Sequence, residues 1–445
     1  MRRERENAMI RVGEWIRVLK GRSMEDRLTR LYGPRSEEKQ RRLCELLEKF
    51  ADRYGEDREA AVFSVPGRSE LAGNHTDHNH GLVIAASVDP DIIAVAAPRQ
   101  DRCVCVESDG FDPIRVDLSA YREPKEAFLG SSASLVAGVA RGWEDRGFRT
   151  GGFDAIMTSD VLRGSGLSSS AAFEVMIGTI LNHLYNDGAA DPMTVAQVGQ
   201  WAENRFFGKP CGLMDQCACA IGGVVALDFA DPEKPVAEPV SFDLTGAGYA
   251  LCMIHTGGSH ADLTADYAAI PSEMKAVAAF FGKDVLREVR EDEVLAALPA
   301  LRGACGDRAV LRALHFFAEN RRVTAMKEAL FGGNLPAYFA QVRASGRSSF
   351  CYLQNVYAPE AVREQGLSLA ICLAARALEG EMAAVRVHGG GFAGTVQAYV
   401  PMSRVKDFSR AMDAVFGEGA CRALYLRPEG AVCLVPPSGG AEAGR

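Results

Sequence analysis

The chain has 445 residues, of which 47% are hydrophobic and 24% charged, a composition typical of a folded globular protein with enough apolar material for two cores. The 50 basic and 58 acidic residues give a formal net charge of −8, and the acids are spread along the chain, which argues against nucleic acid as the main partner. No apolar stretch is long enough to cross a membrane, and the charged residues 1–6 do not fit an export signal. The 12 scattered cysteines form no CxxC pair, so we expect reduced thiols and a cytoplasmic protein rather than disulfides or zinc.

The first part of the chain is expected to be helical. Leucines and charged residues recur at helical spacing over residues 24–31 and 36–53. We therefore expect residues 1–55 to form a helical extension that packs on the first domain. From residue 61 the pattern changes to β-branched alternation, which predicts strands at 82–86, 92–97, 104–107, 153–158 and 224–229. Helices are expected between these strands, at 134–146, 168–186 and 194–207.

A second set of elements follows an acidic, proline-containing stretch at 228–239, which we interpret as a linker or domain edge. The later pattern predicts further strands and helices at 251–254, 309–329, 364–378 and 395–399. This mixture of strand clusters and helices predicts an α+β fold with two domains, at 56–230 and 231–435. The small and polar residues 436–445 are expected to be a frayed tail.

A glycine- and serine-rich segment at residues 163–172 reads RGSGLSSSAA and leads directly into a predicted helix. Glycines let the backbone approach a ligand closely, and serines place hydroxyls beside the free N–H groups of a helix start, a favourable place for a phosphate. The segment is not a Walker loop, because it has no lysine, nor a dinucleotide fingerprint, because Ser169 stands where the third glycine would be. A serine-capped helix without a ligand remains the alternative.

A second segment, residues 65–81, reads VPGRSELAGNHTDHNHG and is more polar than a buried strand needs. We interpret it as a loop of binding residues bounded by glycines. A zinc site built from His75, Asp77, His78 and His80 is the alternative. These four residues are too close together along the chain to wrap a tetrahedral ion easily, and no HExxH spacing occurs. The pattern therefore favours a hydrogen-bonding sugar site.

Two further segments contain glycine turns. Residues 208–216 read GKPCGLMDQ and place Asp215 twelve positions after Glu203, although an isolated aspartate is usually a cap or part of a solvated turn. Residues 385–396 read VRVHGGGFAGTV and form a glycine loop between two apolar strands. The HGGG run is similar to an esterase oxyanion loop, but that enzyme class needs a GxSxG elbow, which the chain lacks. Three successive glycines instead allow close approach to a ligand or to another loop.

Taken together and in this order, the four segments resemble the GHMP kinase superfamily and, within it, the galactokinase family. That family carries the patterns GRxxLxGEHTD, GxGLSSSA, CGIMDQ and GGGFGG, which correspond here to residues 67–77, 164–171, 211–216 and 389–394. The resemblance extends from about Phe63 to Val400 and covers most of the chain. It implies two α+β domains with the active site in the cleft between them.

The resemblance also implies a role for individual residues. Asp215 would face the C1 hydroxyl of a sugar, with Arg68 beside it to lower the pKa of the carboxyl and steady the developing charge. Ser170 and Glu203 would hold Mg²⁺, which prefers oxygen ligands. The ATP phosphates would be cradled by Gly164, Ser165, Gly166, Leu167, Ser168, Ser169 and Ser170. The sugar hydroxyls would be bound by Asn74, His75, Asp77, Gly212 and Tyr267.

The chain departs from the family pattern in and around the sugar segment. Asn74 stands where the family has a glutamate, His78 where it has a tyrosine and Ala393 where it has a glycine. Residues 344–349 replace the family segment Ser-His-x-Ser-Leu-Arg-Asp. The resemblance implies an ATP-dependent kinase, monomeric or homodimeric, that phosphorylates D-galactose at the C1 hydroxyl to give galactose 1-phosphate and ADP. A kinase for N-acetylgalactosamine or L-arabinose, and a non-catalytic galactose and ATP sensor, remain alternatives.

Overall fold

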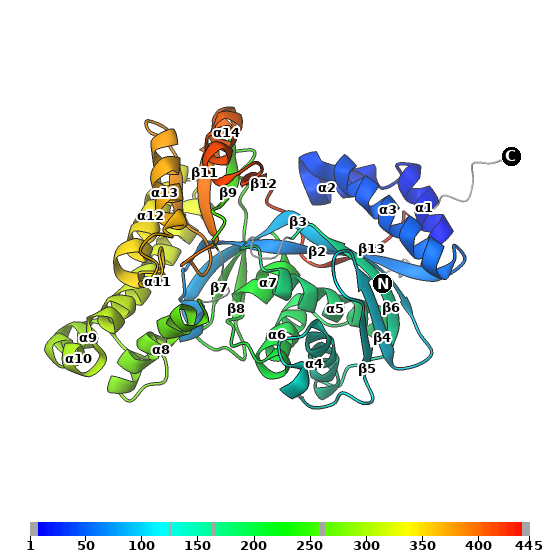
Figure 1. Ribbon diagram of the computed structural model, residues 1–445, viewed down its shortest axis with the longest axis horizontal. Coiled ribbons are helices and arrows are strands. Elements are labelled where there is room, and N and C mark those ends of the chain that lie inside the picture. Colours follow the sequence, from blue (N-terminus) through cyan, green and yellow to red (C-terminus); the bar gives the residue numbers. More distant parts are fainter. Residues whose placement is uncertain (1–7, 125, 162–165, 259–262, 438–445) are drawn as a thin grey trace.

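The computed structural model describes residues 8–124, 126–161, 166–258 and 263–437 (Figure 1). Within these ranges, the N-terminal half is built on a nine-stranded sheet with the order β1-β2-β3-β6-β4-β5, to which β13 is added on β2 and the pair β7 and β8 on β3. The strands are β1 (Ile10–Arg11), β2 (Glu59–Ala72), β3 (Leu82–Pro98), β4 (Cys103–Ser108), β5 (Ile114–Asp117), β6 (Phe153–Ser159), β7 (Val224–Asp228), β8 (Val236–Val240) and β13 (Val432–Leu434).

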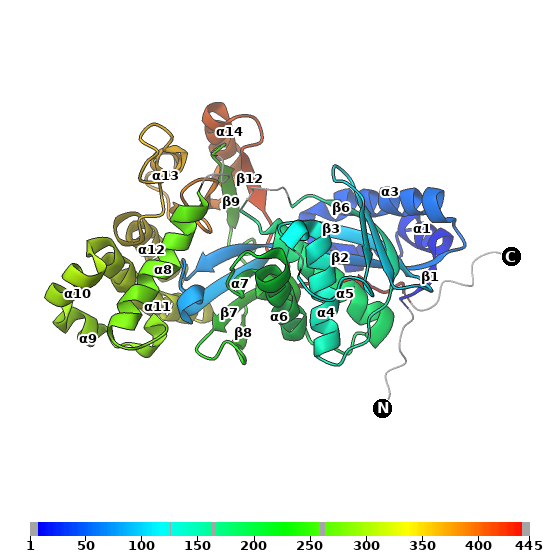
Figure 2. The ribbon, with the colours of Figure 1, turned by 60° about the horizontal axis from the view of Figure 1, so that its bottom comes forward.

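Helices cover both faces of this sheet (Figures 1 and 2). One face packs through Val62 and Val95 on the three N-terminal helices, and the other packs through Phe63 and Ala94 on four later helices. Because successive strand residues point to opposite faces, a strand covered on both sides needs apolar residues at nearly every position. The helices are α1 (Val12–Lys20), α2 (Glu25–Tyr32) and α3 (Ser36–Tyr54), then α4 (Ser132–Asp145), α5 (Ser169–Asn186), α6 (Pro192–Ala202) and α7 (Met214–Ile221).

The C-terminal half adds a four-stranded antiparallel sheet and seven helices within the described residues. The sheet has the order β10-β11-β9-β12, with β9 (Tyr249–His255), β10 (Ala384–Val387), β11 (Thr395–Pro401) and β12 (Cys421–Leu424). The helices are α8 (Thr264–Phe280), α9 (Glu291–Ala296), α10 (Leu298–Cys305), α11 (Asp307–Phe331), α12 (Leu335–Ser348), α13 (Gly366–Ala377) and α14 (Val405–Phe416).

A shared hydrophobic core joins the two halves. Leu71 of β2 and Ile84 of β3 pack in one cluster with Leu251 of β9 and with apolar residues of α11 and α12. The far ends of β2 and β3 therefore reach into the C-terminal half, as Figure 2 shows. This arrangement brings the polar segment that follows β2 next to the glycine loop between β10 and β11.

Several elements differ from the expectation. The polar segment at 65–81 is not a loop throughout, because β2 continues to Ala72 and its polar side chains find buried partners in the C-terminal half. The helix expected at 194–207 is α6 followed by a π-helical turn, Glu203–Phe207. The stretch interpreted as a linker contains β8, which pairs with β7. Near the end of the chain, β13 returns to the large sheet and pairs with β2.

Two observations bear on the environment of the chain. Within the described ranges, no helix is long and apolar enough to cross a membrane. All 12 cysteines fall inside those ranges, and each is a free thiol.

Candidate active site

Two cavities meet between the halves of the molecule. The larger one, about 890 Å³, lies between β2, the start of α7 and helix α8, and the smaller one, about 240 Å³, lies at the start of α5. Five residues line both cavities and so mark their junction: Arg68, Lys209, Asp215, Gly389 and Gly390. Two of them, Arg68 of β2 and Asp215 of α7, are the catalytic residues that the sequence predicts.

The junction is organised by an ion pair between Arg68 and Asp215. Arg68 donates from Nε to Asp215 Oδ1 over 2.6 Å and from Nη2 to Oδ2 over 2.7 Å, and its third nitrogen donates to the Gly166 carbonyl. Burial alone would raise the pKa of Asp215, but the charge of Arg68, its hydrogen bonds and one from Ser168 outweigh burial and lower the pKa. Asp215 is therefore a carboxylate at neutral pH.

Glycine 67 explains how the phosphate segment approaches β2 so closely. The Arg68 amide donates to the Leu167 carbonyl over 3.1 Å, and a Cβ on Gly67 would lie 2.9 Å from that same carbonyl oxygen. The strand pairing of β2 and β3 is also irregular between Pro66 and Gly67. The missing side chain thus lets the two backbones hydrogen-bond beside the ion pair.

The predicted phosphate segment lines the smaller cavity as far as the structure describes it. Gly164 and Ser165 lie outside the described residues. Gly166, Ser168, Ser169 and Ser170 line the cavity, whereas the Leu167 side chain is buried in the core. Ser168 has a left-handed backbone, with φ of 58°, and its hydroxyl donates to Asp215. Helix α5 begins directly after it, so the free N–H groups of its first turn lie beside this cavity.

Ser170 and Glu203, the two predicted magnesium ligands, lie together. The Ser170 hydroxyl donates to Glu203 Oε1 over 3.3 Å, and Gln216 Nε2 donates to Glu203 Oε2 and to the neighbouring Glu174 over 3.0 Å and 2.9 Å. Burial, then the charge of Glu203, raises the pKa of Glu174 well above its usual value, and one Glu174 oxygen is buried without a partner. Among the described residues no cluster of three or more His, Cys, Asp or Glu side chains could hold a metal. A hydroxyl and a carboxylate suit Mg²⁺, which takes its other ligands from phosphate and water.

Four of the predicted sugar residues line the larger cavity: His75, Asp77, Gly212 and Tyr267. His75 Nε2 lies 2.9 Å from the Gly390 carbonyl, and burial lowers the pKa of His75 to about 3, so the ring is neutral. Because a carbonyl only accepts, Nε2 carries the proton and Nδ1 is an acceptor. The Tyr267 hydroxyl donates to the Gly391 carbonyl over 2.8 Å.

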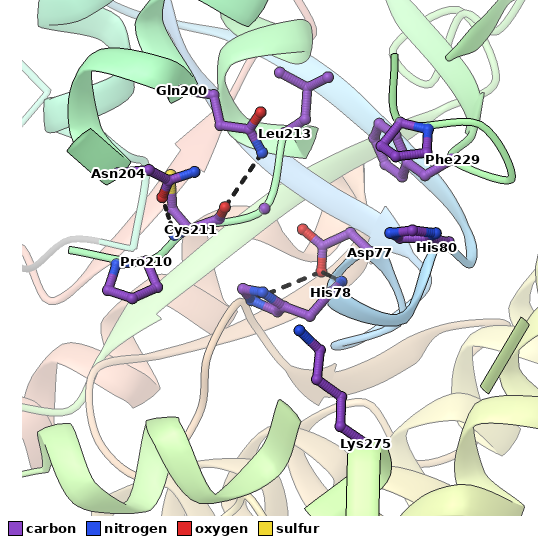
Figure 3. Close-up of a pocket in the computed structure, with 12 residues that line it drawn as sticks. Asp77, His78, His80, Gln200, Asn204, Pro210, Cys211, Leu213, Phe229 and Lys275 are labelled. Carbon is purple, nitrogen blue, oxygen red and sulfur yellow. Dashed lines mark hydrogen bonds and ion pairs between the residues drawn. The ribbon is translucent and has the colours of Figure 1, made fainter. Parts of the chain in front are cut away.

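Asp77 and Gly212 also border a third cavity of about 280 Å³, which Figure 3 shows. A Cβ on Gly212 would lie 1.8 Å from Asp77 Oδ2, so the carboxylate sits directly on the glycine backbone. Gln200 donates to the Cys211 carbonyl over 3.2 Å, and Asn204 accepts from the Cys211 amide over 2.7 Å. Helix α6 and the π-helical turn thus hold the turn that presents Gly212 to the sugar cavity.

Asn74 differs from the other predicted sugar residues, because it is fully buried and lines none of these cavities. Its amide nitrogen donates to Glu70 and to the Gly389 carbonyl, the latter over 2.7 Å, and its oxygen accepts from Ser349 and Asn355. Two of these partners, Glu70 and Gly389, line the larger cavity, so Asn74 lies behind its wall. The structure shows Asn74 bound to protein groups, and its contact with a sugar stays a prediction.

Sequence reasoning missed Glu70 and Lys209 as cavity residues and His388 as a phosphate-side residue. Glu70 is two positions after Arg68 on β2, and strand periodicity places both on one face, which is a signal that could have found it. The 2% exposed Glu70 side chain pairs with buried Arg386 of β10, although burial still raises the pKa of Glu70. His388 has a strongly lowered pKa through burial, so it is neutral.

Comparisons with known proteins show the family of the chain. The family model for the GHMP kinases N terminal domain matches residues 142–223, and the model for the galactokinase galactose-binding signature matches residues 48–98. A galactokinase of Actinobacillus pleuropneumoniae serotype 5b is 32% identical over 372 residues, which are 82% of this chain and 91% of the relative. The serotype 3 galactokinase matches with the same identity and coverage.

Solved structures show the same likeness. The crystal structure of Lactococcus lactis galactokinase complexed with galactose has a TM-score of 0.74 and 25% identity, covering 87% of this chain and 98% of that one. A mevalonate kinase, at 12% identity and a TM-score of 0.58 over 83% of this chain and 99% of its own, is similar in fold alone. These matches confirm the predicted α+β GHMP kinase fold. The chain belongs to the galactokinase family of the GHMP kinase superfamily and is a sugar kinase.

Proposed function

We propose that this sugar kinase transfers the γ-phosphoryl group of ATP to the C1 hydroxyl of D-galactose, giving galactose 1-phosphate and ADP. The observation that carries the proposal is the Arg68–Asp215 ion pair at the junction of the larger and the smaller cavity. One cavity offers serine hydroxyls and a helix start to phosphates, and the other offers a carboxylate, an imidazole and a tyrosine to a sugar. The reacting hydroxyl and the γ-phosphorus would meet between them.

In this mechanism Asp215 orients the C1 hydroxyl and accepts its proton. The sugar oxygen then bonds to the γ-phosphorus while the bond from phosphorus to the bridging oxygen breaks, and ADP leaves with that electron pair. Arg68 keeps Asp215 deprotonated beforehand, because its charge lowers the pKa of the carboxyl. A carboxylate with a lowered pKa is a weak base, so it takes the proton late, as the new bond forms.

The remaining residues bind and orient the two substrates. The unprotonated Nδ1 of His75 and the Asp77 carboxylate accept hydrogen bonds from sugar hydroxyls. Gly212, which has no side chain, allows the sugar to lie against the turn. The N–H groups at the start of α5 and the loop at Gly389 receive the phosphates. Ser170 and Glu203 would hold Mg²⁺, which when bound neutralises phosphate charge.

The third cavity favours one second candidate, a sugar with an added substituent such as N-acetylgalactosamine. It adds about 280 Å³ next to the larger cavity, with which it shares Asp77, His78 and Gly212 as lining residues. An acetamido group is small enough for this space. Its amide would meet polar lining groups there, including Lys275 of α8.

The test is a comparison of sugars with the purified protein and MgATP. ADP release is measured with D-galactose, N-acetylgalactosamine, L-arabinose, D-glucose and mevalonate, and ³¹P and ¹H NMR of the product identify the phosphorylated carbon. We expect the highest kcat/KM with D-galactose and an anomeric phosphate. A higher kcat/KM with N-acetylgalactosamine would favour the second candidate, and galactose binding without ADP release would make the protein a sensor.

A further inference from the structure

The transferring phosphoryl group needs positive charge, and three of the five N–H groups of Arg68 already donate to protein partners. All three of its guanidinium nitrogens donate, two to Asp215 and one to the Gly166 carbonyl. Its side chain is only 8% exposed. Turning it toward a phosphate would break the ion pair that keeps Asp215 deprotonated. A second cation at the junction would leave that pair intact.

Lys209 is such a cation. It follows the π-helical turn, and it is one of the five residues that line both cavities. Its Nζ lies 3.1 Å from Glu203 Oε1, and its side chain is 61% exposed whereas that of Glu203 is 3% exposed. Among the described residues, the ammonium pairs with the Glu203 carboxylate through one of its three N–H donors. The flexible side chain can direct the other two donors elsewhere.

Glu203 cannot keep this ammonium in the same position once a metal ion binds. Its Oε2 already accepts from Gln216 over 3.0 Å, and its Oε1 accepts from both Ser170 and Lys209. A divalent cation held by Ser170 and Glu203 would repel this ammonium. The released side chain would remain on the wall that the two cavities share with Asp215, where the γ-phosphoryl group would be transferred.

We propose that Lys209 is a catalytic residue that leaves Glu203 when the metal nucleotide binds and donates hydrogen bonds to the transferring phosphoryl group. This inference rests on the proposed function. In the step itself, the C1 oxygen bonds to the γ-phosphorus, the bond to the bridging oxygen breaks with its electrons on ADP, and the hydroxyl proton passes to Asp215. Lys209 exchanges no proton and stabilises the charge on the equatorial phosphoryl oxygens.

The proposal predicts a defect that is confined to the transition state. In Lys209→Met we expect kcat to fall by about a hundredfold, the lower end of the loss for one donor to a transition-state oxyanion, because Lys209 has to leave Glu203 before it donates. The KM for galactose should stay unchanged. Lys209→Arg should recover part of kcat, because it restores the charge. The matched control is Lys283→Met, which removes the same charge from an exposed position that lines neither cavity, and it should match the wild type.

A binding measurement separates this contact from a structural role. Magnesium, ADP and aluminium fluoride with galactose imitate the phosphoryl group in transfer, and calorimetry gives the affinity of that complex. Lys209→Met should weaken it by about the same hundredfold, while galactose alone binds as in the wild type. MgADP should bind at least as tightly as in the wild type, because the lysine no longer competes for Glu203. Wild-type kcat and wild-type affinity for the mimic would overturn the role of Lys209 and leave the proposed function standing. A wild-type protein that phosphorylates no sugar would overturn both.

Discussion

At the scale of single residues, the neighbours of Asp215 keep it charged and in place. The substitution Asp215→Asn keeps the shape of the side chain but removes the proton acceptor, so we expect kcat to fall by about 10²–10⁴-fold. The melting temperature should fall as well, because Arg68, at 8% exposure, loses its ion pair. Steady-state kinetics and thermal melts measure the two effects. Asp112→Asn, at an exposed position that lines neither cavity, should change neither, and near-normal turnover by Asp215→Asn would remove the residue from the mechanism.

The pH profile tests the role of Arg68. Its charge and hydrogen bonds lower the pKa of Asp215 below the ordinary 3.8, so the carboxylate becomes protonated only when the pH falls below that value. We expect no acid limb from Asp215 in kcat/KM between about pH 6 and about pH 8. In Arg68→Met the Ser168 hydrogen bond and the Lys209 charge remain, but burial loses its largest opposing contribution. The pKa of Asp215 therefore rises, and the acid limb should lie at higher pH than in the wild type. If the pH profiles of kcat/KM were the same for the wild type and Arg68→Met, Arg68 would not control the pKa of Asp215.

At the scale of elements, the turn before α7 presses against the Asp77 carboxylate. Gly212→Ala would place a methyl group 1.8 Å from Asp77 Oδ2, so the carboxylate has to move out of the sugar cavity. We expect the KM for the sugar to rise by about tenfold or more, the cost of misplacing one hydrogen-bonding group, with MgATP affinity unchanged. Gly303→Ala in α10 is the control, because a Cβ there meets no atom within 4 Å. Sugar kinetics that match between the two variants would show that Asp77 does not hold the sugar.

The loop after β2 is held by partners from the other half of the molecule. Asn74→Glu restores the residue type that the family pattern has, but it buries a second carboxylate beside Glu70. We expect it to lower the free energy of unfolding by about 3 kcal/mol or more, because a buried charge without a partner is costly. Denaturant unfolding measures this. The exchange Glu70→Asn with Asn74→Glu keeps one carboxylate near Arg386 and should recover part of the loss; equal stability of the single variant and the wild type would contradict the buried placement of Asn74.

The contrast between Asp215 and Asn74 shows what the sequence can predict. The local pattern leaves Asp215 as a cap or part of a solvated turn, and the family resemblance of the surrounding motifs is what predicts Asp215 and Ser170 as site residues. Both line the smaller cavity. The direction of the Asn74 side chain depends on Ser349 and Asn355, which are 275 and 281 positions away in the chain. The continuation of β2 through the polar segment has the same cause, because buried Glu70 finds Arg386 from β10. Such long-range polar pairing has no periodic signal in the sequence.

At the scale of the whole molecule, one buried aspartate ties three distant parts of the chain together. Asp91 of β3 accepts from Lys39 over 2.7 Å and from Arg42 over 2.6 Å, both in α3, and Arg427 near β13 lies 3.4 Å away. Burial opposes the charge on Asp91, but these three cations outweigh it and lower the pKa of the carboxyl. The stabilising charge is therefore present above the unfolded value near 3.8 and is lost only as the pH falls through the lower folded value.

This cluster predicts that the N-terminal helices are part of the folded unit that carries the site. Asp91→Ala removes the carboxylate that these three cations share, although Lys39 and Arg42 keep Asp160 and Arg427 keeps the Ser64 hydroxyl. We therefore expect the free energy of unfolding at neutral pH to fall by about 3 kcal/mol, the lower end for a broken buried pair. Asp109→Ala is the matched control, because it removes an ion pair between Lys49 of α3 and the end of β4 in the same sheet. The side chains of this pair are 52% and 55% exposed. Its effect should stay below about 1 kcal/mol. Urea unfolding followed by circular dichroism measures both, and equal losses for the two variants would mean that α3 is held by its apolar face rather than by Asp91.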